Sequence, residues 1–433
     1  MTRPAPESRS APRPGAARLG LLFGALAFCQ GVAEPTEGLI AQPVQALLTR
    51  WGHGPAEVGA FAALVALPWS LKPLYGLLTD FVPLFGRRRQ GYLVLTAGTA
   101  AVALFGLALL PTPPARYGWI LGWLATATVA WAFSDVVADA LMIDRGRPLG
   151  LVGRFQAVQW ASLYAAAILT GAGGGWLSLG GREHRGFLIC GVAATATLLL
   201  AAFAVREPRA PRPTVDARAA VRALGRAARS PGILGAGAFL FLWNFNPFST
   251  VVLRLHVTRT LGLGEAFYGT TQSVMAVGSI LACLGYARLG RRAAAPAMVP
   301  LSIVLGVAST MAYWAVSDRR SAVAASLAVG VCYMTATLIQ LDLAARACPP
   351  EAAGSVFAIL MATENLAAAT STGLGGWLYE RGGELWGAPA SFRILVGIGA
   401  AFTASSWLLL PAIRGEGSGG AGPCRIVPDA SII

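Results

Sequence analysis

Charged residues are scarce in this sequence of 433 residues: Asp, Glu, Lys and Arg make up 12%, about half their usual share in a soluble domain. A soluble protein of this size needs a charged surface, and the 55% hydrophobic content excludes intrinsic disorder. Six Cys without a Cys-x-x-Cys pair argue against a disulfide scaffold, and three scattered His give no metal-ligand spacing. The composition is typical of a polytopic helical membrane protein, and we expect neither a metal nor a cofactor.

Twelve apolar segments are long enough to cross a bilayer, which takes about 20 residues. They cover residues 18–37, 56–79, 91–110, 117–142, 152–178, 186–205, 231–253, 265–287, 296–316, 321–345, 353–379 and 391–413. The chain then divides into a cytoplasmic tail (1–17), a six-helix bundle (18–205), a basic cytoplasmic linker (206–230), a second six-helix bundle (231–413) and a cytoplasmic tail (414–433). We predict an all-α integral membrane protein that is a monomer in the lipid bilayer.

The positive charge of the chain indicates its orientation. Of 34 basic residues all but Lys72 are Arg, and the net charge is +14. With the N-terminus inside, 23 basic residues fall in inner segments and 10 in outer loops, and basic residues favour the cytoplasmic side. This predicts a multi-pass protein of the cytoplasmic membrane with both termini inside. A nucleic-acid-binding arm at 206–230 is the weaker alternative, since topology explains that basic run, and we expect no nucleic-acid partner.

An internal repeat indicates a duplication. Residues 145–177 align without a gap with residues 346–378, so that Arg145 meets Arg346 and Pro148 meets Pro349. The tetrapeptide Gly-Gly-Trp-Leu ends both segments, at 174–177 and at 375–378. The fifth span therefore resembles the eleventh, as two parallel six-helix halves predict.

The most specific motif lies at the end of the second span. It reads Leu67-Pro68-Trp69-Ser70-Leu71-Lys72-Pro73-Leu74-Tyr75-Gly76 and continues with Asp80, Pro83, Gly86, Arg87-Arg88-Arg89 and Tyr92. With the duplication and the basic central loop, it resembles the folate–biopterin transporter family of the major facilitator superfamily. Weaker matches to the family pattern are Gln30-Gly31, Asp135, Asp139, Gln156, Trp160, Phe241-Leu242-Trp243, Pro247 and Leu261-Gly262. The first span departs from that pattern at Glu34-Pro35-Thr36-Glu37, which leaves a different organic solute open beside a folate or pterin.

The resemblance implies a secondary active transporter, not an enzyme, that moves a small organic solute by alternating access. The sequence carries no Gly-x-x-x-x-Gly-Lys-[Ser/Thr] nucleotide loop, which argues against direct drive by ATP. We expect protons to supply the energy through carboxylates in the spans. The alternative class is a non-transporting member of the same scaffold that assists the assembly of a membrane complex.

Ionisable groups within the bilayer cost roughly 2.5–3.5 kcal/mol each, so they are candidates for function. Glu34 and Glu37 share a face of the first span and are either cavity-lining proton acceptors or a solvated pair at its outer end. Lys72 needs a carboxylate partner within the protein, from Asp80, Asp135 or Asp139, or contacts a carboxylate of the solute.

Asp135 and Asp139 lie four residues apart on the fourth span, where like charges repel. Either one of them is protonated or a cation such as Arg154 lies nearby. They could couple protons, accept hydrogen bonds from the aminopyrimidine edge of a pterin, which the resemblance suggests, or form an ion pair near the inner end.

The second half contributes polar groups as well. Asn244 and Asn246, beside Pro247, are expected to interrupt the seventh span, and Gln272 and Glu364 to face the bundle interior. Trp160 and Trp243 lie well inside their spans and could stack on a flat solute. The resemblance adds Gln30 and Gln156 to the candidate site.

The loop after the second span is expected to form a cytoplasmic gate. In the superfamily this loop is a conformational latch, and here it carries Asp80, Arg87, Arg88 and Arg89. The remaining candidates for this gate are Asp144, Arg145, Asp342 and Arg346, of which the last two could simply pair along their helix.

Overall fold

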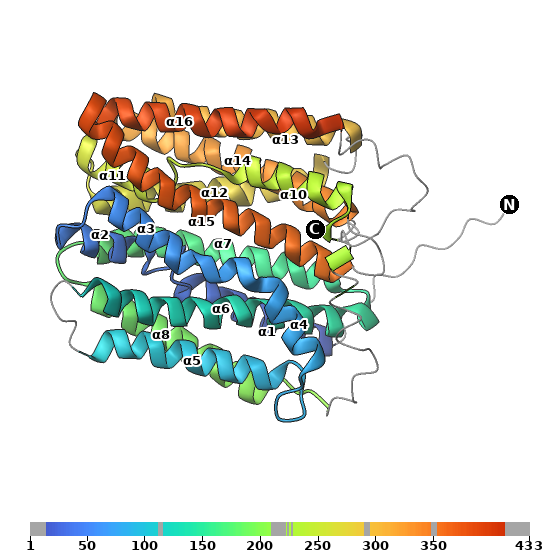
Figure 1. Ribbon diagram of the computed structural model, residues 1–433. Coiled ribbons are helices and arrows are strands. Elements are labelled where there is room, and N and C mark those ends of the chain that lie inside the picture. Colours follow the sequence, from blue (N-terminus) through green and yellow to red (C-terminus); the bar gives the residue numbers. More distant parts are fainter. Residues whose placement is uncertain are drawn as a thin grey trace.

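The computed structural model describes residues 14–110, 116–208, 228–289, 295–347 and 353–411, together with residues 222, 225 and 226. Helices make up almost all of these residues (Figure 1). Residues 1–13 of the predicted N-terminal tail, the C-terminal tail, most of the predicted linker and the loop that contains Arg291 and Arg292 lie outside the described residues, and the first helix begins at Pro14, within the predicted tail.

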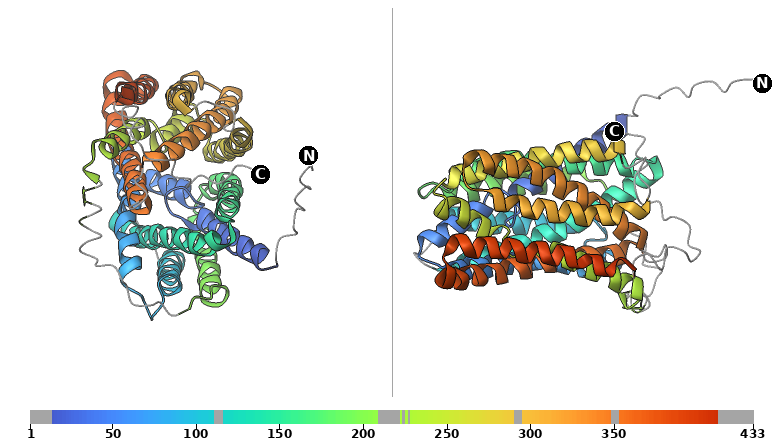
Figure 2. Two further views of the ribbon diagram at one scale, coloured as in Figure 1. Left: turned by 90° about the vertical axis from the view of Figure 1, so that its right-hand side faces the viewer. Right: turned by 90° about the horizontal axis from the view of Figure 1, so that it is seen from above.

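The helices form two groups, which we call the first half and the second half (Figure 2, left). The first half contains α1 (Pro14–Ala33), α2 (Ala41–Arg50), α3 (Pro55–Ala66), η1 (Leu67–Leu71), α4 (Lys72–Phe81), α5 (Gln90–Leu109), α6 (Tyr117–Gly146), η2 (Arg147–Leu149), α7 (Val152–Leu177), α8 (Glu183–Leu199) and η3 (Leu200–Ala204). The second half contains α10 (Pro231–Asn244), α11 (Val251–Leu255), η4 (His256–Thr260), α12 (Glu265–Leu289), α13 (Ala295–Ala312), η5 (Tyr313–Ala315), α14 (Arg319–Ala347), α15 (Ala353–Trp386), α16 (Ala388–Ser405) and η7 (Ser406–Leu409).

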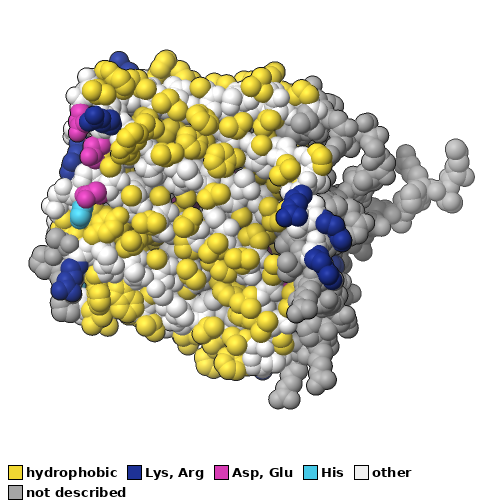
Figure 3. Space-filling view, in the orientation of Figure 1, with side chains coloured by type: hydrophobic (Ala, Val, Ile, Leu, Met, Phe, Trp, Pro, Cys, Tyr) yellow, Lys and Arg dark blue, Asp and Glu magenta, His cyan; other side chains and the backbone are white. Residues whose placement is uncertain are grey.

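The two ends of the bundle are named here by their elements. The α2 end holds α2 and α11 and lies at the left of Figure 1, whereas the α4 end holds the start of α1 and the end of α4. Apolar side chains cover the middle of the surface, and charged side chains gather at its two margins (Figure 3). A broad apolar band with polar ends suits a bilayer.

Among the described residues, nine helices are long and apolar enough to cross a membrane. The predicted fifth, seventh and eleventh spans, which correspond to α7, α10 and α15, are not among the nine. The α10 helix is apolar but only 14 residues long. The all-helical membrane fold is confirmed, and the count of twelve spans stays a prediction.

Three predicted spans end early or are interrupted in the structure. The first helix ends at Ala33 instead of residue 37, because the chain turns sharply at Glu34-Pro35-Thr36-Glu37. The second span bends through the 3₁₀ turn η1, which contains Pro68 and is followed by Pro73, since proline removes a backbone donor. In the seventh span, α10 ends at Asn244, as the sequence predicted.

The halves meet along two helix pairs, α7 with α12 and α3 with α15. Glycines allow the close approach: a Cβ atom on Gly376 would lie 3.0 Å from the Cα atom of Gly59, and one on Gly175 would lie 3.0 Å from the Cα atom of Gly269. Both contacts lie toward the α2 end. Gly175 and Gly376 are equivalent positions of the repeat, so both copies of the motif serve the same type of contact.

Candidate functional site

Lys72 forms an ion pair inside the bundle. Its Nζ atom lies 2.7 Å from Oδ2 of Asp135, and the two side chains are only 20% and 19% exposed. The amide of Gln30 donates to the other carboxylate oxygen, Oδ1, at 2.7 Å. The Lys72 ammonium also lies 4.6 Å from the ring centre of Trp69, a cation–π contact. Of the partners that the sequence left open for Lys72, the structure selects Asp135.

The bend at η1 positions Lys72 and Trp69. Because Pro73 has no N–H, the carbonyl of Trp69, four residues earlier, lacks its helical donor. The side-chain amide of Asn365 on α15 donates to this carbonyl at 3.2 Å. A residue of the second half thus satisfies the backbone group that proline leaves free in the first half.

Glu34 caps the turn after α1, a role that was not predicted from the sequence. It is 5% exposed, and its carboxylate accepts hydrogen bonds from the backbone N–H of Thr36 (2.9 Å) and of Glu37 (2.8 Å), the Thr36 hydroxyl (2.7 Å) and Nε1 of Trp69 (3.1 Å). The expectation of a solvated pair is wrong for Glu34, whose carboxylate caps the turn after α1. Glu34 and Glu37 also share no helix face, because the helix has already ended.

Three further carboxylates surround the ion pair. Asp139 and Glu364 are close enough to Lys72 to interact with it electrostatically, and Glu37 interacts in the same way with Glu364. Glu37 and Asp139 are exposed and Glu364 is half-buried, although all three lie within the bundle. Asp139 accepts a hydrogen bond from Gln159 at 3.4 Å, a partner that the sequence analysis missed.

The cation predicted beside these aspartates is a different residue. Arg154 is exposed, and in the described part of the chain it forms no ion pair with Asp135 or Asp139. Lys72 supplies the positive charge instead. Within this part, Glu37, Asp139 and Glu364 have no Lys or Arg within ion-pair distance, so carboxylates outnumber cations.

Some aromatic residues of the spans lie near the candidate site, and others belong to the hydrophobic core. Trp160 on α7 is half-buried and stacks on Tyr164, with ring centres 6.0 Å apart. Tyr333 on α14 is exposed and lies within electrostatic range of Glu37 and Glu364. Neither tyrosine was predicted as a site residue, although a phenol in the middle of an apolar span is a polar group there, as a carboxylate is.

The prediction that Trp243 stacks on a solute is wrong. It is 1% exposed, and its Nε1 donates to the carbonyl of Ser302 at 3.2 Å, so its ring belongs to the core of the second half. Asn244 and Asn246 are also structural. Their amides donate to the carbonyls of Leu240 (2.9 Å) and Trp243 (3.3 Å), and the second of these has no helical N–H donor because the residue four positions later is Pro247. Gln156 and Gln272 are half-buried on α7 and α12.

A charge cluster at the α4 end contains most of the predicted gate. The Arg89 guanidinium contacts Asp80 at 2.8 Å and Asp144 at 3.4 Å, and it donates to the Thr79 hydroxyl at 2.8 Å. The Glu207 carboxylate caps α5 by accepting the backbone N–H groups of Arg88, Arg89 and Gln90. These contacts all stay within the first half.

Four further residues were predicted to belong to the gate. Arg87 donates to the Gln90 side chain at 2.6 Å, and Arg145 donates to the carbonyl of Arg206. The side chains of Asp342 and Arg346 lie outside the described residues.

A polar cluster at the α2 end was not predicted from the sequence. The predicted spans place Arg254 in an outer loop, but Arg254 lies on α11, is 1% exposed and pairs with Glu265. Because α10 ends at Asn244, Arg254 does not follow a long seventh helix as predicted. It lies on the short helix α11, which packs between the halves.

Comparisons with known proteins agree with this geometry. The sequence profile of the BT1 family matches residues 30–392. A folate-biopterin transporter of Synechocystis sp. is 28% identical over an alignment of 356 residues, which covers 76% of this chain and 68% of that protein. The probable folate-biopterin transporter 4 of Arabidopsis thaliana is 23% identical and covers 72% of this chain, with 78% of its own length matched.

Solved structures share the fold. A D-xylose-proton symporter superposes with a TM-score of 0.71 at 14% identity over 92% of this chain and 98% of that structure. The nucleoside transporter NupG gives a TM-score of 0.70 at 13% identity over 90% of this chain and 98% of that structure. At such identities the likeness describes the architecture alone.

Proposed function

This chain belongs to the BT1 family and is a secondary transporter with the major facilitator fold, and we propose that it moves a folate or a pterin across the cytoplasmic membrane, coupled to protons. The substrate proposal rests on the relatives named folate-biopterin transporter. We further propose that both termini are cytoplasmic and that two six-helix bundles move against each other around a central site.

The observation that carries the proposal is the Lys72–Asp135 ion pair with unpaired carboxylates around it. Its residues come from both halves, since Lys72 and Asp135 lie on α4 and α6 and Glu364 lies on α15. Because all of them remain partly exposed within the bundle, we propose that water and a solute reach them.

The chemistry of this group suits a flat heterocycle with hydrogen-bond donors. A carboxylate accepts two parallel N–H groups from an aminopyrimidine edge, and the ammonium of Lys72 can donate to a ring carbonyl. Trp69 and Trp160 offer aromatic faces on two sides of the bundle. We propose Gln30, Lys72, Asp135 and Trp160 as solute contacts, with Gln156 and Gln272 as outer members of the site.

Glu37, Asp139 and Glu364 are the proposed proton carriers. Several carboxylates near one another in a site with few cations cannot all be ionised at low cost, so protonation there depends on pH and on the solute. Binding a proton removes a negative charge from the site and so eases the reorientation of the halves.

Uptake into proteoliposomes tests the proposal. We expect labelled pterin and folate to accumulate when a pH gradient is imposed and to equilibrate without one. In a variant with Glu37→Gln, Asp139→Asn and Glu364→Gln, accumulation should fall at least tenfold while solute exchange persists. Glu57→Gln, which neutralises an exposed carboxylate near the start of α3, is the control and should transport normally.

The same assay contains the contradicting outcomes. Uphill, pH-driven uptake that survives in the triple variant contradicts proton coupling through these residues. No saturable flux of any pterin or folate contradicts the substrate class, and stable co-purification of a membrane complex without flux would favour the assembly role.

A further inference from the structure

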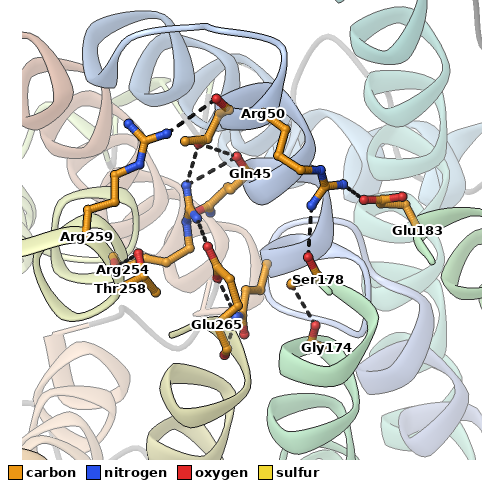
Figure 4. Close-up of polar contacts among 11 residues, drawn as sticks. Gln45, Arg50, Gly174, Ser178, Glu183, Arg254, Thr258, Arg259 and Glu265 are labelled. Carbon is orange, nitrogen blue, oxygen red and sulfur yellow. Dashed lines mark hydrogen bonds and ion pairs between the residues drawn. The ribbon is translucent and has the colours of Figure 1, made fainter. Parts of the chain in front are cut away.

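A buried guanidinium joins the two halves at the α2 end (Figure 4). Arg254 on α11 is 1% exposed, and its Nη1 lies 2.5 Å from Oε1 of Glu265 at the start of α12. The same guanidinium donates to the side chain of Gln45 (3.1 Å), the carbonyl of Gln45 (3.2 Å) and the hydroxyl of Thr49 (2.8 Å). Gln45 and Thr49 belong to α2, so one side chain of the second half holds one helix of the first.

Glu265 makes the reciprocal contact. Its Oε2 and its backbone carbonyl both accept from the side-chain amide of Gln42 on α2, each at 2.8 Å. Gln42 is only 9% exposed. The cluster of Gln42, Gln45, Thr49, Arg254 and Glu265 therefore spans the interface, with Gln42 and Arg254 buried and the other three half-buried; we call it the α2 latch.

The glycine contacts lie at the same end. Gly269 follows Glu265 by one helical turn, and Gly59 lies in the first turns of α3. In contrast, the Arg89 cluster at the α4 end connects only elements of the first half. Among the described residues, the polar contacts between halves are thus concentrated at the end where the helices also approach most closely.

We infer that the α2 latch holds the α2 end closed and must open in each transport cycle, so that Arg254 and Glu265 are positioning residues for transport. A buried ion pair is nearly balanced between its desolvation cost and its attraction, and water can replace its hydrogen bonds when the halves separate. A contact of this type fixes one geometry while it is dry and can be exchanged for contacts with water at small net cost. This inference rests on the transporter fold and holds whichever solute is carried.

Hydrogen–deuterium exchange of the purified full-length protein tests the inference. We expect Glu265→Gln to leave Arg254 as a buried charge without its carboxylate, and to speed amide exchange in α2 and in the first turns of α3 and α12 at least threefold. Exchange at the start of α5, at the opposite end, should not rise. The charge-swapped variant Arg254→Glu/Glu265→Arg should recover part of the protection.

A matched control removes an ion pair that does not cross the interface. Glu384→Gln removes the Arg381 partner within α15. It should not change exchange in α12. Thr49→Val, which deletes a single latch hydrogen bond, is the mild variant in case Glu265→Gln does not fold, and it should raise the same exchange rates to a smaller extent.

Transport assays give a second readout. If the latch works as inferred, Glu265→Gln should alter the ratio of net uptake to solute exchange, because only net uptake requires the empty carrier to reorient. Exchange rates in Glu265→Gln and Thr49→Val that match those of the Glu384→Gln control would overturn the inference. So would a rise spread evenly over the whole molecule.

Discussion

At the scale of single residues, Lys72 is the best-defined charge in the interior. It is the only Lys of the chain, and its ammonium has Asp135 as counterion and Trp69 as a π partner. Removing one member of such a pair leaves the other charge without compensation, which costs more than removing both.

We expect Asp135→Asn to destabilise the protein by about 3 kcal/mol, the lower end of the range for a buried pair, because both side chains keep some contact with water. Lys72→Met alone should cost a similar amount. The double variant Lys72→Met/Asp135→Asn should recover at least half of the loss. Thermal unfolding in detergent measures these differences, and additive single effects would contradict an ion pair that acts as a unit.

The importance of Lys72 could be predicted from the sequence, but the positions of the side chains around it could not. Lys72 stands out because a lone ammonium in an apolar segment is costly, and Asp135 was among its possible partners. Trp243 and Glu34 were harder to place. Whether a tryptophan in a span faces the interior or the core depends on which helix packs against it, and Glu34 is a cap only because the helix ends one residue earlier.

At the scale of elements, helix breaks place the functional side chains. Asn244 and Asn246, beside Pro247, predicted the end of α10. The break at η1 was not predicted, although Pro68 and Pro73 supply its physical cause. The side chain that satisfies the free carbonyl at η1 could not be predicted. Asn365 donates to the Trp69 carbonyl from the other half of the molecule, and the local sequence carries no information about which helices pack together. Spacing along one helix predicts neighbours, whereas contacts between helices follow from packing.

The Asn365 contact gives a prediction about the bend. Asn365→Leu should leave the Trp69 carbonyl unsatisfied and cost roughly 1–3 kcal/mol. Adding Pro73→Ala supplies a backbone N–H four residues after Trp69 and should restore much of the stability. Thermal unfolding of the single and double variants measures this; a Pro73→Ala change that never rescues Asn365→Leu contradicts the assignment.

The cap of α5 gives a second prediction at this scale. The Glu207 carboxylate accepts the first N–H groups of α5 and lies near the positive end of the helix dipole. Glu207→Gln should cost about 1 kcal/mol and speed amide exchange in the first turn of α5. The last turn of α5 serves as the internal reference, and equal changes at both ends would rule out a local capping effect.

At the scale of the whole molecule, the repeat explains why both helix pairs between the halves have a glycine contact toward the α2 end. The sequence alignment of residues 145–177 with 346–378 places Gly175 and Gly376 in equivalent positions, and each contacts a glycine of the opposite half. The helical fold, the membrane location and the family could be predicted from composition, spans and the motif at 67–92. The α2 latch could not, because its members are far apart in the chain and look like ordinary loop residues.

The glycine contacts predict how strongly this closure depends on side-chain size. A Cβ atom on Gly376 would lie 2.3 Å from the carbonyl oxygen of Pro55 and 3.0 Å from the Cα atom of Gly59, and neither backbone atom can move aside independently. Gly376→Ala should therefore separate α3 from α15 and shift the protein toward forms that are open at the α2 end. Amide exchange in α2 and α12 should rise as it does in Glu265→Gln, although the ion pair itself is unchanged. Gly122→Ala, at a position in α6 where a Cβ atom meets nothing within 4 Å, is the matched control. If Gly376→Ala and Gly122→Ala exchange alike, the halves do not depend on backbone contact at this end; if only Gly376→Ala opens, small residues and the latch act together to set the closed state.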